Sequence, residues 1–236
     1  MGDYTNMSGY YDVIMTSGYY DYKKIVDSLT SHGPQLNILE IGCGTGLILE
    51  ELAKRQPDMP ITGIDLTGPM LSIAQKRLAP FATISLLQQN ICELTLAVQH
   101  ELAFSYGGVW YFVIDGDKEP FLVSHIAQEE PNRQGLSKVA QHMKTGGQLL
   151  LGVQGPHHDY ASPISNGMMY SQKIEPTENG FTKHYYLADG DTTLMAQTIQ
   201  YRTYGFAQAL ALLEGFGFSY QPYSGDKPQF LTFTKS

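Results

Sequence analysis

Residues 38–46 read Ile-Leu-Glu-Ile-Gly-Cys-Gly-Thr-Gly. An apolar run that ends in closely spaced glycines predicts a buried strand, a tight turn and the start of a helix. Gly42, Gly44 and Gly46 would let a ligand approach the backbone beside the N–H groups of the helix N-terminus. The spacing is G-x-G-x-G, whereas the dinucleotide fingerprint G-x-G-x-x-G needs its third glycine where Leu47 stands. This departure disfavours a nicotinamide site.

Polar side chains follow the next two predicted strands. Asp65 ends the strand predicted at 61–65, where a carboxylate can accept hydrogen bonds from both hydroxyls of a ribose. Asn90 follows the strand predicted at 83–88 and can hold an adenine amino group, with Ile91 against the ring. Glu40 stands inside an apolar strand, where burial is costly unless the carboxylate is hydrogen-bonded. In this order, the residues indicate a nucleoside-type cofactor.

The segment from Glu40 to Gly46, together with Ile64-Asp65, resembles the first two motifs of the class I S-adenosylmethionine-dependent methyltransferases. The resemblance covers 35–153. It implies an α/β fold with a Rossmann-like seven-stranded sheet, strand order 3-2-1-4-5-7-6, and an antiparallel last strand. It also implies S-adenosyl-L-methionine as cofactor and S-adenosyl-L-homocysteine as product. The family more often has Asp at the position of Asn90. The cofactor-binding residues that we expect are Tyr11, Tyr19, Tyr22, Glu40, Gly42, Cys43, Gly44, Gly46, Asp65, Leu66, Met70, Asn90, Ile91 and Ser105.

Composition limits the partners. The 236 residues include 23 acidic and 15 basic side chains, a formal net charge of −8, and 42% are apolar, which predicts one globular domain with an insertion. Because the chain has so few cations, it cannot form the basic surface that binds a phosphate backbone, and we expect no nucleic-acid partner.

No segment reaches the roughly 18 continuous apolar residues of a membrane span. Cys43 and Cys92 lack the spacing of a disulfide framework or a metal site. With a polar N-terminus, we expect a cytoplasmic monomer or homodimer without metal.

Short apolar segments alternate with helical patterns up to residue 153, which predicts a mostly parallel sheet covered on both faces. A less regular helical region is expected between 107 and 146, where Pro120 and Pro131 stand. Helices are predicted at 19–31, 47–54, 69–78 and 206–214. Strands are predicted at 36–42, 61–65, 83–88, 101–106, 148–153, 218–222 and 229–234.

After residue 154 the pattern changes to three alternating segments, 168–177, 181–188 and 192–203. Asn179-Gly180 and Asp189-Gly190 separate them, and both pairs are strong hairpin signals. We therefore predict an antiparallel β insertion after the fifth strand. The expected division is a helical lid, a cofactor-binding core, an insertion over the acceptor site and a C-terminal helix with a hairpin, at 1–34, 35–153, 154–203 and 204–236.

A tyrosine-rich N-terminus and a late antiparallel insertion resemble the subgroup that includes glycine and amino-sugar N-methyltransferases. In that subgroup the N-terminal segment covers the cofactor, although Met15 stands where an amino-sugar enzyme has tyrosine. We expect catalytic roles for Tyr11, His157 and His158, and His125 at the surface or as a cap. Packing of a terminal helix is the alternative for the tyrosine, and a solvated loop is the alternative for His157 and His158. The acceptor would contact Trp110, Tyr160 and Arg202. The alternatives are a core position for Trp110, a solvated loop for Tyr160 and an ion pair for Arg202.

The predicted activity is transfer of a methyl group from S-adenosylmethionine to an amine or hydroxyl of a small metabolite. The Asn-Pro-Pro-Tyr motif of enzymes that methylate exocyclic or amide nitrogens is absent after the fourth strand, where residues 105–110 read Ser-Tyr-Gly-Gly-Val-Trp. A nicotinamide-dependent oxidoreductase and a non-catalytic cofactor-binding domain remain the alternatives, because a fold alone does not confer activity.

Overall fold

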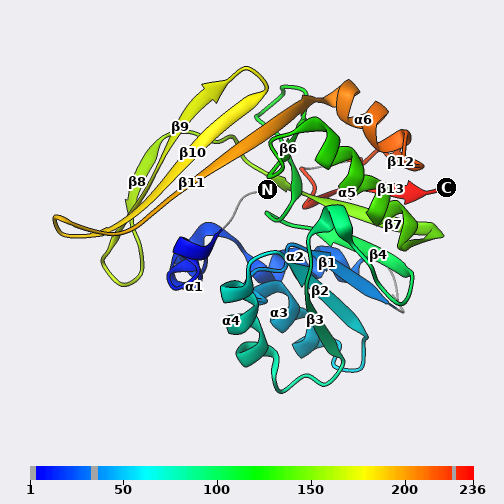
Figure 1. Cartoon of the computed structure of the whole chain (residues 1–236), viewed down its shortest axis with the longest axis horizontal. Helices are drawn as coiled ribbons and strands as arrows, with labels where there is room; N and C mark the ends of the chain where they lie inside the picture. The colour runs from blue at the N-terminus through cyan, green and yellow to red at the C-terminus, as the bar shows by residue number, and fades with distance from the viewer. Residues whose placement is uncertain (1–3, 33–36, 225–226) are drawn as a thin grey trace.

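The computed structural model describes residues 4–32, 37–224 and 227–236. Its core is a twisted sheet whose strands run parallel except for β13 (Figure 1). The strands are, in spatial order, β3 (Ile84–Gln88), β2 (Ile61–Asp65), β1 (Ile38–Ile41), β4 (His100–Ser105), β7 (Met143–Gln154), β13 (Phe230–Lys235) and β12 (Phe218–Gln221). β13 pairs antiparallel with both β7 and β12. The predicted α/β fold and its strand order 3-2-1-4-5-7-6 are therefore confirmed.

Helices cover both faces of this sheet. Strand β1 is buried on both sides, so Ile38 and Leu39 contact different clusters of apolar side chains. One face is covered by α2 (Tyr22–Thr30), α3 (Leu47–Arg55) and α4 (Gly68–Leu78). The other face is covered by α5 (Glu129–Gln141) and α6 (Phe206–Glu214). Burial of β1 on both sides explains why its sequence shows a continuous apolar run with a single acid.

A second, antiparallel sheet extends from the end of β7. Its strands are β5 (Trp110–Val113), β6 (Phe121–Ser124), β11 (Thr192–Gly205), β10 (Gly180–Asp189), β9 (Met169–Thr177) and β8 (Tyr160–Pro163). Its outer strands form a long ribbon that projects from the core (Figure 1). The predicted meander corresponds to β9, β10 and β11, and the hairpins turn at Gly180 and Gly190.

Strands β5 and β6 correct the prediction of an irregular helical region between 107 and 146, of which only α5 is helical. All four residues of β5 are buried, so its sequence lacks the polar alternation that marks a half-buried strand. The β5–β6 hairpin also provides the edge onto which β11 pairs, through Tyr204 and Leu122. The insertion is thus attached to the core along one continuous hydrogen-bonded path.

The N-terminal segment consists of η1 (Thr5–Met7), α1 (Tyr11–Ile14) and η2 (Met15–Tyr19), followed by α2. The helix predicted at 19–31 begins at Tyr22 instead, because Asp21 caps it by accepting a hydrogen bond from the Lys24 N–H over 3.0 Å. Met7 and Ile14 are buried against side chains of the second sheet. The boundary expected at 34 and 35 lies outside the described residues, and the division into four segments stays a prediction.

Three further points complete the fold. A single turn, η3 (Ile91–Glu93), follows β3. Among the described residues, no helix is both long enough and apolar enough to cross a membrane. The described His, Cys, Asp and Glu side chains form no cluster of three or more that would suit a metal ion.

Candidate functional site

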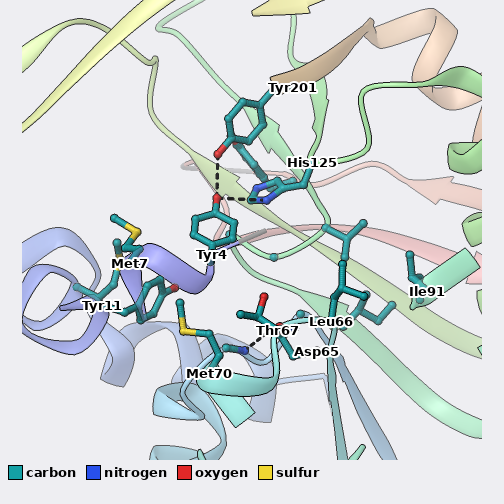
Figure 2. Close-up of a pocket in the computed structure, with 18 of the residues that line it drawn as sticks. Tyr4, Met7, Tyr11, Asp65, Leu66, Thr67, Met70, Ile91, His125 and Tyr201 are labelled. Carbon is teal, nitrogen blue, oxygen red and sulfur yellow. Dashed lines mark hydrogen bonds between the residues drawn. The ribbon is translucent and has the colours of Figure 1, made fainter. Parts of the chain in front are cut away.

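A cavity lies where the carboxyl ends of the core strands face the N-terminal segment and the second sheet. It holds about 930 Å³ of empty space, including the part that is open to solvent. The lining comes from the glycine loop and the ends of β1 and β2, from the N-terminal segment, and from β5, β10 and β11. Figure 2 shows Tyr4 between an end that holds Asp65 and Met70 and an end that holds His125 and Tyr201.

The glycine loop joins β1 to α3 and exposes backbone to the cavity. Gly42 and Gly44 line it and have φ of 77° and 53°, a conformation that side chains disfavour. A Cβ on Gly42 would lie 2.9 Å from the Gly108 Cα, so the two loops that meet here leave no room for one. The N–H groups of Gly42 and Cys43 both donate to the Ile64 carbonyl at 2.9 Å. This part of the loop is therefore held in place against β2.

Asp65 fixes the same loop from the end of β2. Its Oδ2 accepts a hydrogen bond from the Gly44 N–H, and its Oδ1 accepts one from the Thr67 N–H, each at 2.8 Å. Burial raises the pKa of the Asp65 carboxyl, and these backbone donors oppose the rise. A carboxylate oxygen has more than one lone pair, so both oxygens can still accept hydrogen bonds from a ligand.

Apolar side chains form the wall beside Asp65. Leu66, Met70 and Ile91 line the cavity as predicted, together with Ile64. Gln89 also lines it and was not predicted, because an amide directly after a strand has no distinctive pattern. Asn90 was expected here, but its side chain accepts a hydrogen bond from the Cys92 N–H over 3.1 Å and caps η3.

Six residues predicted to bind cofactor lie outside the cavity lining, and the lining therefore does not support a direct contact for them. Ser105 is fully buried and accepts a hydrogen bond from the Trp110 N–H over 3.4 Å. Glu40 lies in β1, where burial raises the pKa of its carboxyl well above the usual value, and its Oε2 has no hydrogen-bond partner among the described residues. The six residues are Tyr22, Glu40, Cys43, Gly46, Asn90 and Ser105.

The N-terminal segment closes the cavity over the glycine loop. Tyr11 and Tyr19 line it as predicted. Four residues that were not predicted also line it: Tyr4, Met7, Met15 and Tyr20. Tyr11 points toward the loop, and a Cβ on Gly44 would lie 3.9 Å from its ring (Figure 2). The tyrosines of this segment that line the cavity thus begin at Tyr4, earlier in the chain than the three tyrosines that were predicted.

A chain of phenols ends at a histidine on the far side of the cavity. The Tyr4 hydroxyl lies 2.9 Å from the Tyr201 hydroxyl and 3.3 Å from His125 Nδ1 (Figure 2). Tyr185 extends the chain, with 2.5 Å between its hydroxyl and that of Tyr201. Burial lowers the pKa of His125 to about 3 and raises that of Tyr4 to about 12, so all four groups are neutral at pH 7.

His125 corrects the expectation of a surface or cap position, since only 7% of it is exposed. It follows β6, a strand that was not predicted, so its position could not be inferred. His157 lines the cavity as predicted, and its Nε2 lies 2.9 Å from the Tyr111 hydroxyl. Burial lowers the pKa of His157 to about 3. His158 lies outside the lining, and its ring is 5.8 Å from that of Tyr160.

The three residues expected to contact the acceptor also lie outside the lining. Trp110 is fully buried in the core, and its Nε1 donates to Asn132 Oδ1 over 2.9 Å. Arg202 pairs with Glu129 at 2.9 Å, the ion pair that was the alternative. Tyr160 packs edge-on against Tyr170, at 5.8 Å between ring centroids. Each has a structural partner, so the lining does not support their assignment to the acceptor, which stays a prediction.

A family model matches just under half of the chain, the part that holds the glycine loop and Asp65. Residues 38–147 match the family model described as a methyltransferase domain. This stretch is therefore similar to a methyltransferase domain. The match contains the glycine loop, Asp65, Ile91 and His125, and it ends before β8. The methyltransferase domain thus leaves most of the second sheet unmatched.

Curated relatives match a third or more of the chain. The putative methyltransferase YqeM of Bacillus subtilis is 38% identical over 94 residues, which are 39% of this chain and 36% of that protein. A malonyl-[acyl-carrier protein] O-methyltransferase of Priestia megaterium is 36% identical over 78 residues, 33% of this chain and 28% of that protein. The chain thus spans about a third of the length of these relatives.

Solved structures match nearly the whole fold. DesVI of Streptomyces venezuelae superposes with a TM-score of 0.69 at 16% identity and covers 96% of this chain and 97% of its own. CalS10, an amino pentose methyltransferase of Micromonospora echinaspora, superposes with a TM-score of 0.68 at 15% identity and covers 96% of each chain. At such identity the likeness shows the fold, including the second sheet.

Proposed function

We propose that the protein transfers a methyl group from S-adenosylmethionine to an amine or hydroxyl of a small molecule. One observation carries the proposal: the glycine loop with Asp65 opens into the same cavity as the neutral Tyr4–His125–Tyr201 cluster. A cofactor end and a second polar end in one enclosed space suit a reaction between two bound molecules. The methyltransferase domain match and the names of the relatives support the same activity.

The residues present fit S-adenosylmethionine. Asp65 would bind the ribose hydroxyls, and the apolar wall of Ile64, Leu66 and Ile91 would hold the adenine. The glycine loop would take the methionine portion, and Tyr11 and Tyr19 would cover it. Aromatic faces attract a soft cation, which suits the sulfonium of this cofactor. When bound, the cofactor supplies an electrophilic methyl group.

The chain's own residues would orient the acceptor. In the transfer, the lone pair of the acceptor would form the new bond to the methyl carbon, and the electron pair of the broken carbon–sulfur bond would stay on sulfur as the neutral thioether of S-adenosylhomocysteine. The acceptor would lose its proton to water. The neutral imidazole of His125 can accept a hydrogen bond from an N–H or O–H group, because burial keeps it unprotonated at pH 7. His157 is also neutral, but Tyr111 and Lys183 already contact its two ring nitrogens. Exclusion of water by the N-terminal segment would favour displacement by a weak nucleophile.

Two measurements test this function. Calorimetric titration should show binding of S-adenosylhomocysteine and none of NAD, and the opposite result would favour the oxidoreductase. Incubation with methyl-labelled S-adenosylmethionine and a panel of amines, amino sugars, phenols and carboxylates should then label at least one acceptor. Tight binding of S-adenosylhomocysteine with no labelled product across the panel would favour a non-catalytic cofactor-binding domain.

A further inference from the structure

A buried lysine faces the cavity from the second sheet. Lys183 lies in the middle of β10, is 2% exposed and lines the cavity. Its Nζ is 3.5 Å from His157 Nδ1 and 4.9 Å from the centre of the Tyr185 ring. Among the described residues, no carboxylate lies within ion-pair distance of this ammonium. Burying an ammonium without an anion costs free energy, and a bound anion would offset that cost.

The described residues around Lys183 offer it no ion pair. The groups near it are the imidazoles of His125 and His157 and the neutral phenol of Tyr185. The positive charge of Lys183 contributes to the lowered pKa of both histidines. Among the described residues that line the cavity, Asp65 is the one carboxylate, and it is bound to the Gly44 and Thr67 amides. Lys183 is the one cationic side chain in the same described lining, and it lies beside His157 and Tyr185.

We propose that Lys183 binds a carboxylate of the methyl acceptor. The inference rests on the proposed function and adds a chemical class to it: the acceptor is an acidic small molecule rather than a neutral or purely cationic one. A charge-assisted hydrogen bond from a buried ammonium is short and strong, and it would fix one end of the acceptor while the other end reacts. Tyr111 holds His157 beside this site through the 2.9 Å contact between its hydroxyl and Nε2.

The protonation of Lys183 suits such a role. Burial lowers its pKa to about 7, so close to neutral pH the side chain is only partly charged. A carboxylate that enters the cavity favours the charged form and supplies the missing anion. The neutral form limits the cost of burying the side chain before the acceptor arrives.

The test uses the whole protein saturated with S-adenosylhomocysteine. Malonate, glycinate and benzoate are titrated against their amides, malonamide, glycinamide and benzamide, by calorimetry. We expect each carboxylate to bind at least about tenfold more tightly than its amide. Lys183→Met should abolish the difference, and Lys183→Arg should retain it for at least the smaller anions. Lys173→Met is the matched control, because Lys173 lies on the neighbouring strand β9 with its side chain 60% exposed.

Two results would overturn the inference. Carboxylates and amides would bind equally, or Lys183→Met would keep the preference of the wild type. Replacing a buried cation by an apolar side chain of similar length is often tolerated, and unchanged affinity for S-adenosylhomocysteine would show that the variant is folded. If S-adenosylhomocysteine itself does not bind to the wild type, the proposed function fails instead. Titration of the wild type with S-adenosylhomocysteine alone therefore distinguishes the two failures.

Discussion

The carboxylate of Asp12 accepts a hydrogen bond from Thr45 Oγ1 over 2.6 Å, and so joins the N-terminal segment to the glycine loop. The same carboxylate pairs with Arg77 of α4, and the Arg77 Nε donates to the Thr45 carbonyl over 2.9 Å. These three side chains connect the segment that covers the cavity with the loop on its floor. The position of the N-terminal segment over the cavity therefore depends on these polar contacts as well as on the apolar packing of Met7 and Ile14.

Replacing Asp12 should loosen this closure. Asp12→Ala removes the acceptor of the Thr45 hydroxyl and of Arg77. We expect this to destabilise the closed position of the N-terminal segment, relative to an open one, by about 1–2 kcal/mol. Hydrogen exchange of residues 4–19 should become faster, and affinity for S-adenosylhomocysteine should fall by about threefold to thirtyfold. Asp58→Ala, at an exposed turn, is the control. Unchanged exchange in Asp12→Ala would show that apolar packing alone closes the cavity.

Asp65→Ala should weaken binding of S-adenosylhomocysteine by about 1–3 kcal/mol, measured by calorimetry. The substitution removes the proposed acceptor of the ribose hydroxyls and also frees the Gly44 and Thr67 N–H groups. Asp65→Asn keeps one carbonyl oxygen and should lose less. If both variants fold and bind as tightly as the wild type, the cofactor does not contact this carboxyl.

Much of this site could be predicted because its residues follow strands directly along the chain. Asp65 ends a strand, and the glycine loop follows another, so the carboxyl edge of a parallel sheet brings them together. The meander could be predicted as well, because Gly180 and Gly190 mark tight hairpins between alternating strands.

The opposite end of the cavity could not be predicted, because its residues are far apart in sequence. Tyr4 meets Tyr201 across 197 positions and His125 across 121. Both contacts depend on β6, whose fully buried neighbour β5 shows no polar alternation. Lys183 looks like an ordinary charged residue of an alternating strand, but it is 2% exposed, and His157 of the loop after β7 lies 3.5 Å from its Nζ. For Trp110 the sequence left a core position open, and the structure buries it there, because the aromatic run of residues 110–112 does not indicate which side of a strand each ring faces.

We expect the buried side-chain amide of Asn132 to stabilise the fold and not to contact a ligand. It accepts hydrogen bonds from the Trp110 indole and from Ser124 Oγ, and donates to the carbonyls of Ile126 and Gln128. Asn132→Ala leaves these groups without their partner, so we expect the free energy of unfolding to fall by about 2–5 kcal/mol in denaturant titration. Affinity of the folded variant for S-adenosylhomocysteine should stay within about twofold of the wild type. A large loss of affinity with full stability would place this network in the site.

Binding of a carboxylate to the S-adenosylhomocysteine complex should depend on pH through Lys183. The lysine has a folded-state pKa of about 7, lowered by burial, and only its protonated form attracts an anion. Affinity should therefore be highest below pH 7 and fall by up to about tenfold per pH unit above it. His125 and His157 face the lysine with pKa values near 3, and Tyr185 has one raised well above 10, so none of them titrates between pH 6 and 9.

Calorimetry with malonate at pH 6, 7, 8 and 9, in buffers of different ionisation enthalpy, measures both the affinity and the protons taken up. We expect proton uptake to approach one per malonate bound as pH rises above 7, because the anion then has to recruit the proton that Lys183 lacks. Lys183→Arg stays charged over this range and should show a flat profile with no uptake. A wild-type affinity that is flat or rises with pH would contradict the assignment. If only the rate of methyl transfer rises with pH, Lys183 acts on the acceptor as a base instead of binding its carboxylate.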